Sequence, residues 1–370
     1  MDSAFRFADD LGPAKIILVH EPACALKAVL VVDNVAAGPA IGGLRMAPDV
    51  SVEECARLAR AMTLKNAAAG LAHGGGKSVL FGDPRMPRGD KERLIRAFAG
   101  ALADERDYIF GPDMGTDEQC MAWVHDEIGR AVGLPRELGG IPLDEIGATG
   151  WGLAHATEVA LQDSGCPLAG ARVAIQGFGA VGRNAMRFLG ERGAVLVAAS
   201  DTGGTLHDPN GIDIAALTAL KKAGRSVVSH DRGEALTGEA ILDVACDIWI
   251  PAARPDVINE SNAERLNTRL VVEGANIPAT EAAERRLHQR GILCVPDFIA
   301  NAGGVICAAV EYHGGTQSTA FAAIEEKLRR NTDEVLRDAR ERGVTPRVAA
   351  VQLAAGRVRK AMATRRWGVF

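Results

Sequence analysis

The stretch RVAIQGFGAVGRNAMRFLGERGAVLVAASD, residues 172–201, decides the fold of this chain. An apolar strand over 172–176 runs into three glycines with the spacing G-x-G-x-x-G, at Gly177, Gly179 and Gly182. A helix with an apolar face follows, and a second strand over 195–199 leads to Asp201. In such a unit the glycines allow a tight turn and the close approach of a pyrophosphate, whose charge the helix N-terminus attracts. The segment therefore predicts a Rossmann-like domain that binds a nicotinamide dinucleotide.

The acid at the end of the second strand indicates which dinucleotide is bound. Asp201 lies 19 residues beyond Gly182 (201 − 182), where a carboxylate can accept hydrogen bonds from the adenosine ribose. Since the following residues, TGGT, include no arginine, we expect NAD as the cofactor, with NADP as the alternative. The residues of this motif predicted to bind the cofactor are Gly177, Phe178, Gly179, Ala180, Val181, Gly182 and Asp201.

Strand-like segments continue beyond this motif as DIWIPAA, LVVEGAN and ILCVPDF, with the helical segment EAAERRLHQRG between the last two. Strands that alternate with helices predict a doubly wound parallel sheet. Ala252, Asn276 and Asn301 follow three of these strands, on the side where such sheets bind ligands, and are predicted to line the cofactor site. The alternative for each asparagine is a plain turn residue. Two charged amphipathic helices from about Ala320 complete the chain.

The first half of the chain contains a second informative stretch, SVEECARLARAMTLKNAAAGLAHGGGKSVLFGD, residues 51–83. Ser51 and Glu54 form a capping box at the start of a predicted helix. The side chain of Lys65 starts from the apolar face of this helix, where a lysine is costly unless an anion meets it. We expect the glycines at 74–76 to form a turn that brings the backbone close to a ligand, with Lys77 ending it. The stretch is no P-loop, because the helix precedes the glycines and a strand follows them. The alternative for Lys77 is a solvated lysine.

Asp113 occupies the loop between the strand DYIFG and a helix for which Thr116 and Gln119 are the predicted capping box. Loops between regular elements often carry functional side chains, although a lone aspartate before a helix can equally be a turn residue or a cap. The loop-like stretch 135–150 follows and breaks every periodic pattern. We place a domain boundary there, with one domain over 1–147, a second over 148–329, and the helices of 330–370 packing back on the first.

Composition narrows the class of protein. The 370 residues are 47% hydrophobic and 24% charged with a net charge of −5, which fits two globular domains and argues against nucleic acid as the main partner. The apolar runs are too short to span a bilayer, and the N-terminus lacks the features of a signal peptide. Seven cysteines without a C-x-x-C pair fit reduced thiols in a cytoplasmic protein and predict no metal site.

The chain resembles the glutamate/leucine/phenylalanine/valine dehydrogenase family along nearly its whole length. The segments that carry the resemblance are GPAIGGLRM, MTLKNAAAGLAHGGGKSVLFGDPR, GPDMGTDE, GATGWG, QGFGAVG, EGAN and PDFIANAGGV. The resemblance implies reversible oxidative deamination of an L-amino acid to a 2-oxo acid and ammonia, with hydride transfer to NAD(P). It also implies an N-terminal α/β domain for substrate binding and oligomerisation, a cleft between it and the dinucleotide-binding domain, and a homo-oligomer of six or eight subunits.

The resemblance also implies roles for individual residues. Lys65 is similar to the lysine that pairs with the substrate α-carboxylate, and Lys77 to the catalytic lysine. Asp113 is similar to the acid that moves protons to and from the amino group. Thr149 and Asn276 resemble residues that line the nicotinamide site, and Asn301 one near both the nicotinamide and the substrate.

Substrate choice is where the chain departs from the glutamate-specific members, which carry a lysine at the place of Ile41 and a serine at that of Ala308. A glutamate side chain would leave a buried carboxylate unpaired here, at a cost of several kcal/mol. We therefore predict an apolar, branched-chain or aromatic, L-amino acid, bound by Lys65, Gly42, Gly43, Ile41, Met62, Val305 and Ala308. One alternative is a glutamate dehydrogenase whose carboxylate partner is relocated to Lys27, Arg45 or His73. A remote alternative is a non-catalytic dinucleotide sensor, which would not need Lys65, Lys77 and Asp113 together.

Overall fold

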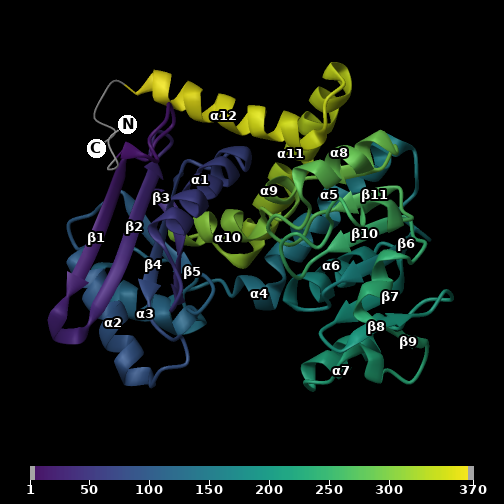
Figure 1. The fold of residues 1–370 in the computed structure, drawn as a ribbon, viewed down its shortest axis with the longest axis horizontal. Helices are drawn as coiled ribbons and strands as arrows, with labels where there is room; N and C mark the ends of the chain where they lie inside the picture. The colour runs from purple at the N-terminus through teal and green to yellow at the C-terminus, as the bar shows by residue number, and fades with distance from the viewer. Residues whose placement is uncertain (1–4, 366–370) are drawn as a thin grey trace. The chain divides into compact units, whose positions relative to one another are not determined.

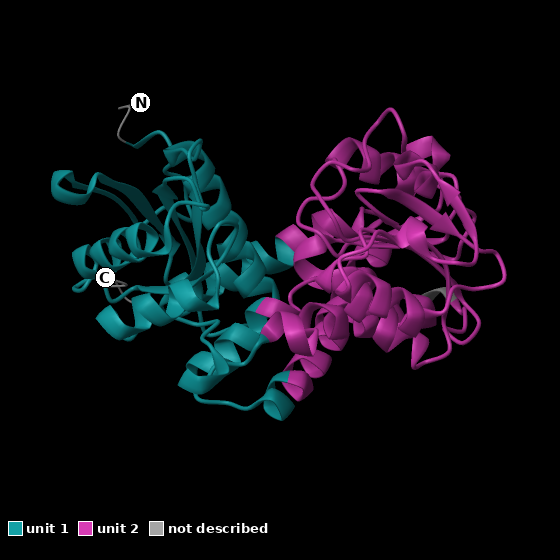
Figure 2. Ribbon diagram, turned by 90° about the horizontal axis from the view of Figure 1, so that it is seen from below, with its two compact units in different colours: residues 1–142, 305–320, 352–370 teal, residues 143–304, 321–351 magenta. Residues whose placement is uncertain are grey.

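The computed structural model describes residues 5–365, and the chain forms two compact units (Figure 2). Unit 1 contains residues 1–142, 305–320 and 352–370, and unit 2 contains residues 143–304 and 321–351. The chain passes from one compact unit to the other after residues 142, 304, 320 and 351. The predicted domain boundaries, which assign 1–147 with 330–370 to one domain and 148–329 to the other, stay a prediction. No helix within 5–365 is long and apolar enough to cross a membrane.

Unit 1 is built on a five-stranded mixed sheet with the strand order β1-β2-β4-β3-β5. β1 and β2 form an antiparallel hairpin, β2 pairs antiparallel with β4, and β3 pairs in parallel with both β4 and β5 (Figure 1). The strands are β1 (Lys15–Glu21), β2 (Leu26–Asn34), β3 (Ala40–Ala47), β4 (Gly74–Phe81) and β5 (Tyr108–Pro112).

Helices cover both faces of this sheet, which explains why β2 reads as a nearly unbroken apolar run. Leu30 and Val32 face a core shared with the helices α2 (Arg88–Ala101) and α3 (Glu118–Ile128). Val29 and Val31 face the opposite core, shared with the helix α1 (Val52–Ala68). Successive residues of one strand thus pack on opposite cores, as the period of two requires.

Unit 2 is built on a seven-stranded sheet with the order β12-β11-β10-β6-β7-β8-β9. The first five strands in this order are parallel, as predicted, but β8 and β9 pair antiparallel at one edge, so the sheet is mixed. The chain turns back directly after Asp201, which pairs with Gly204 across a tight hairpin, and no crossover helix intervenes. The strands are β6 (Arg172–Gln176), β7 (Val195–Asp201), β8 (Gly204–His207), β9 (Glu234–Leu236), β10 (Ile248–Pro251), β11 (Leu270–Val272) and β12 (Leu293–Val295).

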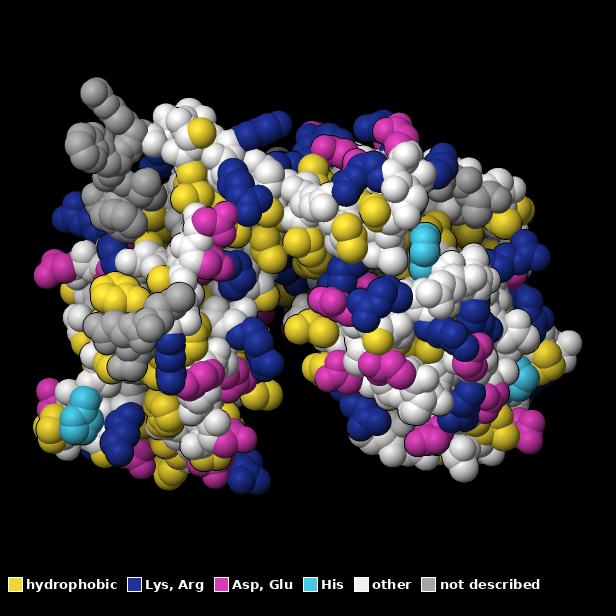
Figure 3. Space-filling view, turned by 45° about the horizontal axis from the view of Figure 1, so that its top comes forward, with side chains coloured by type: hydrophobic (Ala, Val, Ile, Leu, Met, Phe, Trp, Pro, Cys, Tyr) yellow, Lys and Arg dark blue, Asp and Glu magenta, His cyan; other side chains and the backbone are white. Residues whose placement is uncertain are grey.

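The remaining helices include the one after the glycine motif and the two predicted at the end of the chain. They are α4 (Leu143–Ile146), α5 (Ala148–Ser164), α6 (Ala180–Gly190), α7 (Ile214–Lys222), α8 (Glu281–Gln289), α9 (Asp297–Ala300), α10 (Gly303–Tyr312), α11 (Gln317–Arg342) and α12 (Pro346–Thr364). On the face shown in Figure 3, basic and acidic side chains are interspersed over each unit. All seven cysteines are free thiols.

Two local predictions were wrong. The glycines at 74–76 form no turn but the first part of β4, where they are buried. A Cβ at Gly75 would lie 2.0 Å from the backbone nitrogen of Thr63 in α1, so the strand and the helix touch backbone to backbone. The predicted capping box of α3 is also displaced: Asp117 caps the helix by accepting from Cys120 N, while the Thr116 hydroxyl donates to Leu44 O.

Candidate functional site

Two of the residues predicted to be catalytic form an ion pair in unit 1. Lys77 extends from β4, and its Nζ lies 2.6 Å from Oδ2 of Asp113, which directly follows β5. The lysine is only 5% exposed, so water solvates its side chain very little. Arg45 of β3 donates from Nε to the same carboxylate oxygen at 3.0 Å, and its other end binds Glu54 of α1. Asp113 is therefore neither a helix cap nor a plain turn residue.

The two cations decide the charge of Asp113. Burial raises the pKa of this carboxyl, but the charge and hydrogen bond of Lys77 and the charge of Arg45 outweigh burial and hold the pKa below its usual value. Asp113 is therefore a carboxylate near neutral pH and can accept a proton from a substrate held beside it. Sequence reasoning considered Arg45 only as a relocated carboxylate partner, although its position two residues after Gly43 places both on one face of β3.

The predicted glycines of β3 have different tasks. A Cβ at Gly43 would meet Asp113 Cβ at 2.8 Å and Lys77 Nζ at 3.1 Å, so the absent side chain leaves the space that this ion pair occupies. A Cβ at Gly42 would instead lie 1.9 Å from Gly76 O, so Gly42 allows β3 and β4 to approach each other. Of the two, Gly43 is the one that borders the ion pair.

Ile41 alternates onto the same face of β3 as Gly43, and it is buried in a small apolar cluster. The structure brings Ile41 and Ala308 of α10 together in this cluster, as the substrate prediction requires. The other buried members are Ile109, Val132 and Ala309, and the partly buried Leu71 and Tyr312 pack against them. Met62 and Val305, the other predicted pocket residues, are half-buried and are not members of the cluster.

Lys65 lies in the last turn of α1 and is half-buried. The position of this turn is fixed by its neighbour Asn66, whose Nδ2 donates to Gly74 O at 2.7 Å and to Ile41 O at 3.3 Å. The end of α1 is thus tied to both β3 and β4, the strands that carry Ile41 and Lys77. The role of Lys65 towards a substrate carboxylate stays a prediction.

The three candidates for a relocated carboxylate partner have different surroundings. Lys27 is exposed and opposes His20 in the β1–β2 hairpin, whereas Arg45 already binds Asp113 and Glu54. His73 is buried, with Nδ1 3.0 Å from Pro39 O and Nε2 3.0 Å from Nε2 of His313. Burial lowers the pKa of His73, which keeps it neutral and makes it a weak partner for a carboxylate.

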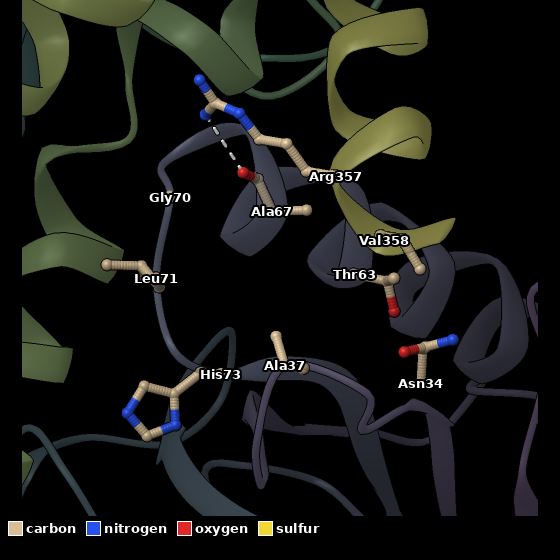
Figure 4. Close-up of a pocket in the computed structure, with 10 residues that line it drawn as sticks. Asn34, Ala37, Thr63, Ala67, Gly70, Leu71, His73, Arg357 and Val358 are labelled. Atoms are coloured by element: carbon tan, nitrogen blue, oxygen red, sulfur yellow. Dashed lines mark hydrogen bonds between the residues drawn. The ribbon is translucent and has the colours of Figure 1, made fainter. Parts of the chain in front are cut away.

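A cavity of about 240 Å³ in unit 1 lies beside α1, the loop leading into β4, and α12 (Figure 4). Arg357 of α12 reaches the carbonyl of Ala67 at its rim. The lining residues are Asn34, Ala37, Thr63, Ala67, Gly70, Leu71, His73, Gly74, Arg357 and Val358. None of Lys65, Lys77 and Asp113 lines this cavity, so it is separate from the ion pair.

The glycine motif in unit 2 has the geometry that a dinucleotide needs. Gly177 has a φ of 96°, and a Cβ at Gly182 would lie 2.3 Å from Gly177 O, so the turn and the helix start are packed tightly together. Gly179 faces open space, and it begins α6 without a side-chain cap or an acidic residue in the first turn. The backbone N–H groups there are those that bind phosphate. Ala180 and Val181 are the first residues of the helix, whereas the side chain of Phe178 is fully buried.

Asp201 already accepts several hydrogen bonds. Lys221 donates from Nζ at 2.5 Å, the Ser226 hydroxyl at 2.7 Å, and the backbone nitrogens of Gly203 and Val227 at 2.9 Å. Burial raises the pKa of Asp201, but these donors, led by Lys221, hold it below its usual value. Sequence reasoning missed Lys221, which lies 20 residues further along the chain in α7.

The predicted nicotinamide residues lie on neighbouring segments of unit 2. Asn301, at the end of α9, donates from Nδ2 to Asn276 Oδ1 at 3.1 Å. A Cβ at Gly304 would meet Thr149 Oγ1 at 3.4 Å, which places Thr149 beside the segment that follows Asn301. Ala252 follows β10, and its N–H donates to Gln176 O immediately before the glycine motif.

Known proteins share this architecture and much of this sequence. The family described as Glutamate/Leucine/Phenylalanine/Valine dehydrogenase matches residues 139–366, and the Glu/Leu/Phe/Val dehydrogenase dimerisation domain matches residues 16–130. Among curated relatives, a glutamate dehydrogenase of Aeropyrum pernix is 39% identical, covering 90% of this chain and 85% of its own. An NADP(+)-dependent glutamate dehydrogenase of Pyrobaculum calidifontis shows the same identity and coverage. Among solved structures, a hetero-hexameric glutamate dehydrogenase of Thermus thermophilus in a Leu-bound form aligns with a TM-score of 0.85 and 29% identity, over 96% of this chain and 91% of its own.

Proposed function

This chain belongs to the glutamate/leucine/phenylalanine/valine dehydrogenase family, whose members are oxidoreductases acting on CH–NH₂ donors, and on this premise we propose that it deaminates an apolar L-amino acid. The observation that carries the proposal is the burial of Ile41 and Ala308 in one apolar cluster, on the face of β3 that also borders the Lys77–Asp113 ion pair. A substrate held at the ion pair would meet hydrocarbon, and no cation, at those two positions.

In the proposed reaction the amino group loses a proton and Cα loses a hydride, which leaves an iminium. Water adds to the iminium, one of its protons passes to the nitrogen, which departs as ammonia, and the other is released as the carbonyl forms. The bound dinucleotide supplies the hydride acceptor. Asp113, a carboxylate near neutral pH, accepts the proton from the amino group. Lys77 donates a hydrogen bond to the oxygen of the water-derived hydroxyl and then of the carbonyl, where negative charge develops. Lys65 is proposed to hold the α-carboxylate as a protonated ammonium group.

The second candidate substrate is glutamate, because the relatives that are 39% identical are named glutamate dehydrogenases. Against it stands the cost of several kcal/mol for leaving a buried carboxylate unpaired beside Ile41 and Ala308. Arg45 is the cation on the same face of the strand, but a glutamate side chain would have to compete for it with Asp113 and Glu54. The apolar substrate therefore fits the surroundings better.

We also propose NAD as the preferred dinucleotide. The carboxylate of Asp201 would repel the 2′-phosphate of NADP, and a ribose hydroxyl can replace one of its present donors. Lys221 favours the opposite choice, because a lysine beside the ribose can neutralise a phosphate. The name of the Pyrobaculum relative shows that the family also contains NADP-dependent enzymes.

A panel of the twenty L-amino acids, assayed with NAD and with NADP by the absorbance of the reduced cofactor, tests both proposals. We expect leucine-, valine- or phenylalanine-like substrates to be oxidised with the highest kcat/KM, and NAD to be preferred. Oxidation of glutamate alone would refute the argument from Ile41 and Ala308, and a strict preference for NADP would refute that from Asp201. Light scattering coupled to gel filtration tests the further proposal, from the dimerisation domain, that the chain forms a homo-oligomer.

A further inference from the structure

One arginine in unit 2 holds three carboxylates. Arg347, in the first turn of α12, donates from Nε to both oxygens of Glu284 at 2.6 and 2.7 Å. It also donates from its terminal nitrogen to Glu273 at 2.9 Å and to Asp297 at 3.1 Å. The side chains of the three acids are 0–8% exposed and that of Arg347 is 15% exposed. Because buried charges are costly to leave unpaired, such a cluster places each member within narrow limits.

Two of these acids begin the segments that carry the predicted nicotinamide residues. Glu273 directly follows β11 and opens the loop that contains Asn276, and Asp297 is the first residue of α9, at whose end Asn301 lies. The two acids are also linked to each other, because Asp297 N donates to Glu273 Oε2 at 3.0 Å. One guanidinium therefore ties both segments at their starting points.

The loop around Asn276 is held at both ends. Glu273 precedes the loop in the chain and is bound to Arg347. After the loop comes Ile277, whose N–H donates to Asp297 Oδ2 at 2.8 Å and whose φ of 49° lies in the left-handed region that a β-branched residue rarely adopts. Such a conformation persists only where surrounding contacts impose it, and Asp297 supplies that contact.

The two asparagines are joined by a hydrogen bond. Asn301 Nδ2 donates to Asn276 Oδ1 at 3.1 Å and to the carbonyls of Gly274 and Ala275 at 3.3 and 3.1 Å. Its own Oδ1 is buried and receives no hydrogen bond from any group within residues 5–365. This oxygen can therefore accept a hydrogen bond from a ligand N–H, and the carboxamide of a nicotinamide offers such a group.

We propose that Arg347 is a positioning residue for the nicotinamide end of the dinucleotide site, which it acts on by fixing Asn276 and Asn301 through Glu273 and Asp297. The inference rests on the proposed function, because the nicotinamide assignment of the two asparagines does. Arg347 itself need not touch the dinucleotide. Its planar guanidinium binds Glu284 through Nε and both Glu273 and Asp297 through a terminal nitrogen, and the compact ammonium group of a lysine cannot reproduce this spacing of donors.

The charge balance of the cluster fits this role. Three ionised carboxylates facing one guanidinium would leave an excess of negative charge in a buried site. Burial, followed by the charge of Glu284, raises the pKa of Glu273 well above its usual value, which favours the neutral form of this acid and reduces the excess of negative charge. Two further groups near Arg347 are uncharged: Cys294 of β12, whose thiol pKa is raised by burial, and the ring of Phe298, which lies 5.8 Å from the guanidinium.

The test compares Arg347→Lys with the wild type and with Arg337→Gln, which removes an exposed ion pair to Asp333 on α11. Binding of NADH is measured by its fluorescence without amino acid, and kcat and both KM values are measured with the best substrate of the panel. We expect Arg347→Lys to weaken NADH binding and to raise the KM for the dinucleotide by about tenfold, the loss that corresponds to about one misaligned hydrogen bond. The KM for the amino acid should change little, and Arg337→Gln should match the wild type in every value.

Unchanged NADH affinity and kinetics in a folded Arg347→Lys protein would overturn the inference, as would an equal loss in Arg337→Gln. A merely structural role would lower the unfolding temperature and leave the dinucleotide KM of the folded enzyme unchanged, and that result also counts against it. Should Arg347→Lys fail to fold, Asn301→Asp decides instead, because a carboxylate cannot donate to Asn276: wild-type NADH affinity there refutes the positioned pair. Should the wild type oxidise no amino acid, the proposed function fails, while NADH binding still tests Arg347.

Discussion

Replacing Gly43 by alanine tests whether the Lys77–Asp113 ion pair performs the chemistry. The added Cβ would stand 2.8 Å from Asp113 Cβ, 3.1 Å from Lys77 Nζ and 3.0 Å from Pro112 O. Ordinary contact begins at 3.4 Å, so Asp113 must recede by 0.6 Å (3.4 − 2.8). The 2.6 Å ion pair to Lys77 cannot survive that shift unchanged. The single methyl group therefore disturbs both proposed catalytic residues without removing either functional group.

The size of the effect follows from the geometry. Misplacing reacting groups by about 1 Å costs about 10²-fold, so a shift of this size should lower kcat/KM by about 10- to 100-fold. Overpacking a buried site costs about 1–3 kcal/mol of unfolding free energy. A matched control is Gly100→Ala in α2, whose added Cβ meets nothing within 4 Å and which should keep full activity and gain about 0.5–1 kcal/mol.

The assay follows amino-acid-dependent reduction of the dinucleotide for the wild type and both variants, and urea unfolding gives the free energies. Wild-type kcat/KM in Gly43→Ala would refute the reasoning, because the ion pair would then tolerate displacement. A Gly43→Ala protein that loses stability but keeps full activity would likewise indicate that Lys77 and Asp113 have only a structural role.

Further predictions concern the same site and the cofactor. Lys77→Ala should abolish deamination while NADH still binds in a fluorescence titration, and Asp113→Asn should abolish turnover; substantial turnover in either variant contradicts its assigned role. Because the pKa of Asp113 is depressed in the folded protein, its contribution to stability is fully present above the unfolded pKa, about 3.9, and is lost as pH falls through the folded pKa. Acid titration of the unfolding free energy should therefore show a smaller loss for Asp113→Asn than for the wild type. The double variant Ile41→Lys with Ala308→Ser should gain activity towards glutamate and lose it towards apolar substrates, as measured by the ratio of their kcat/KM values. Lys221→Gln should raise the KM for NADP more than that for NAD, and an equal effect on both would remove Lys221 from cofactor selection.

The dinucleotide unit was predictable because its signals are local. The spacing of Gly177, Gly179 and Gly182, the flanking strands and the acid at 201 all lie within one segment, and β6, α6 and β7 form where the pattern predicts them. The turn predicted at 74–76 was wrong for the complementary reason. Glycine has a low intrinsic preference for strands, so the local pattern did not predict one here. Glycine is needed in β4 because groups distant in the sequence, such as Thr63 of α1 and the ring of Tyr108, come close to its backbone.

The charged partners show the same limit more sharply. Lys77 and Asp113 stood out as a lysine and an aspartate near strand ends, but their contact depends on the order β4-β3-β5, which no local pattern contains. The sequence did not reveal that Arg45, Lys221 and Arg347 bind functional or positioning carboxylates, because each of these carboxylates lies on a different element of the chain. Sequence periodicity finds the strands that carry functional groups, whereas the pairing of charges follows from which strands become neighbours.

The alternation of one strand links the chemistry to the choice of substrate. Ile41 and Gly43 lie on the same face of β3, and two residues of a strand span about 6.6 Å. An amino acid whose amino group is held at the Asp113 carboxylate therefore needs an extended side chain, such as that of leucine or phenylalanine, to approach the Ile41 side chain, whereas the single methyl group of alanine falls short. On this reasoning, kcat/KM should rise steeply from alanine to leucine, because each methylene buried in the cluster contributes about 0.8 kcal/mol. A flat series from alanine to leucine would mean that the substrate side chain does not reach the apolar cluster.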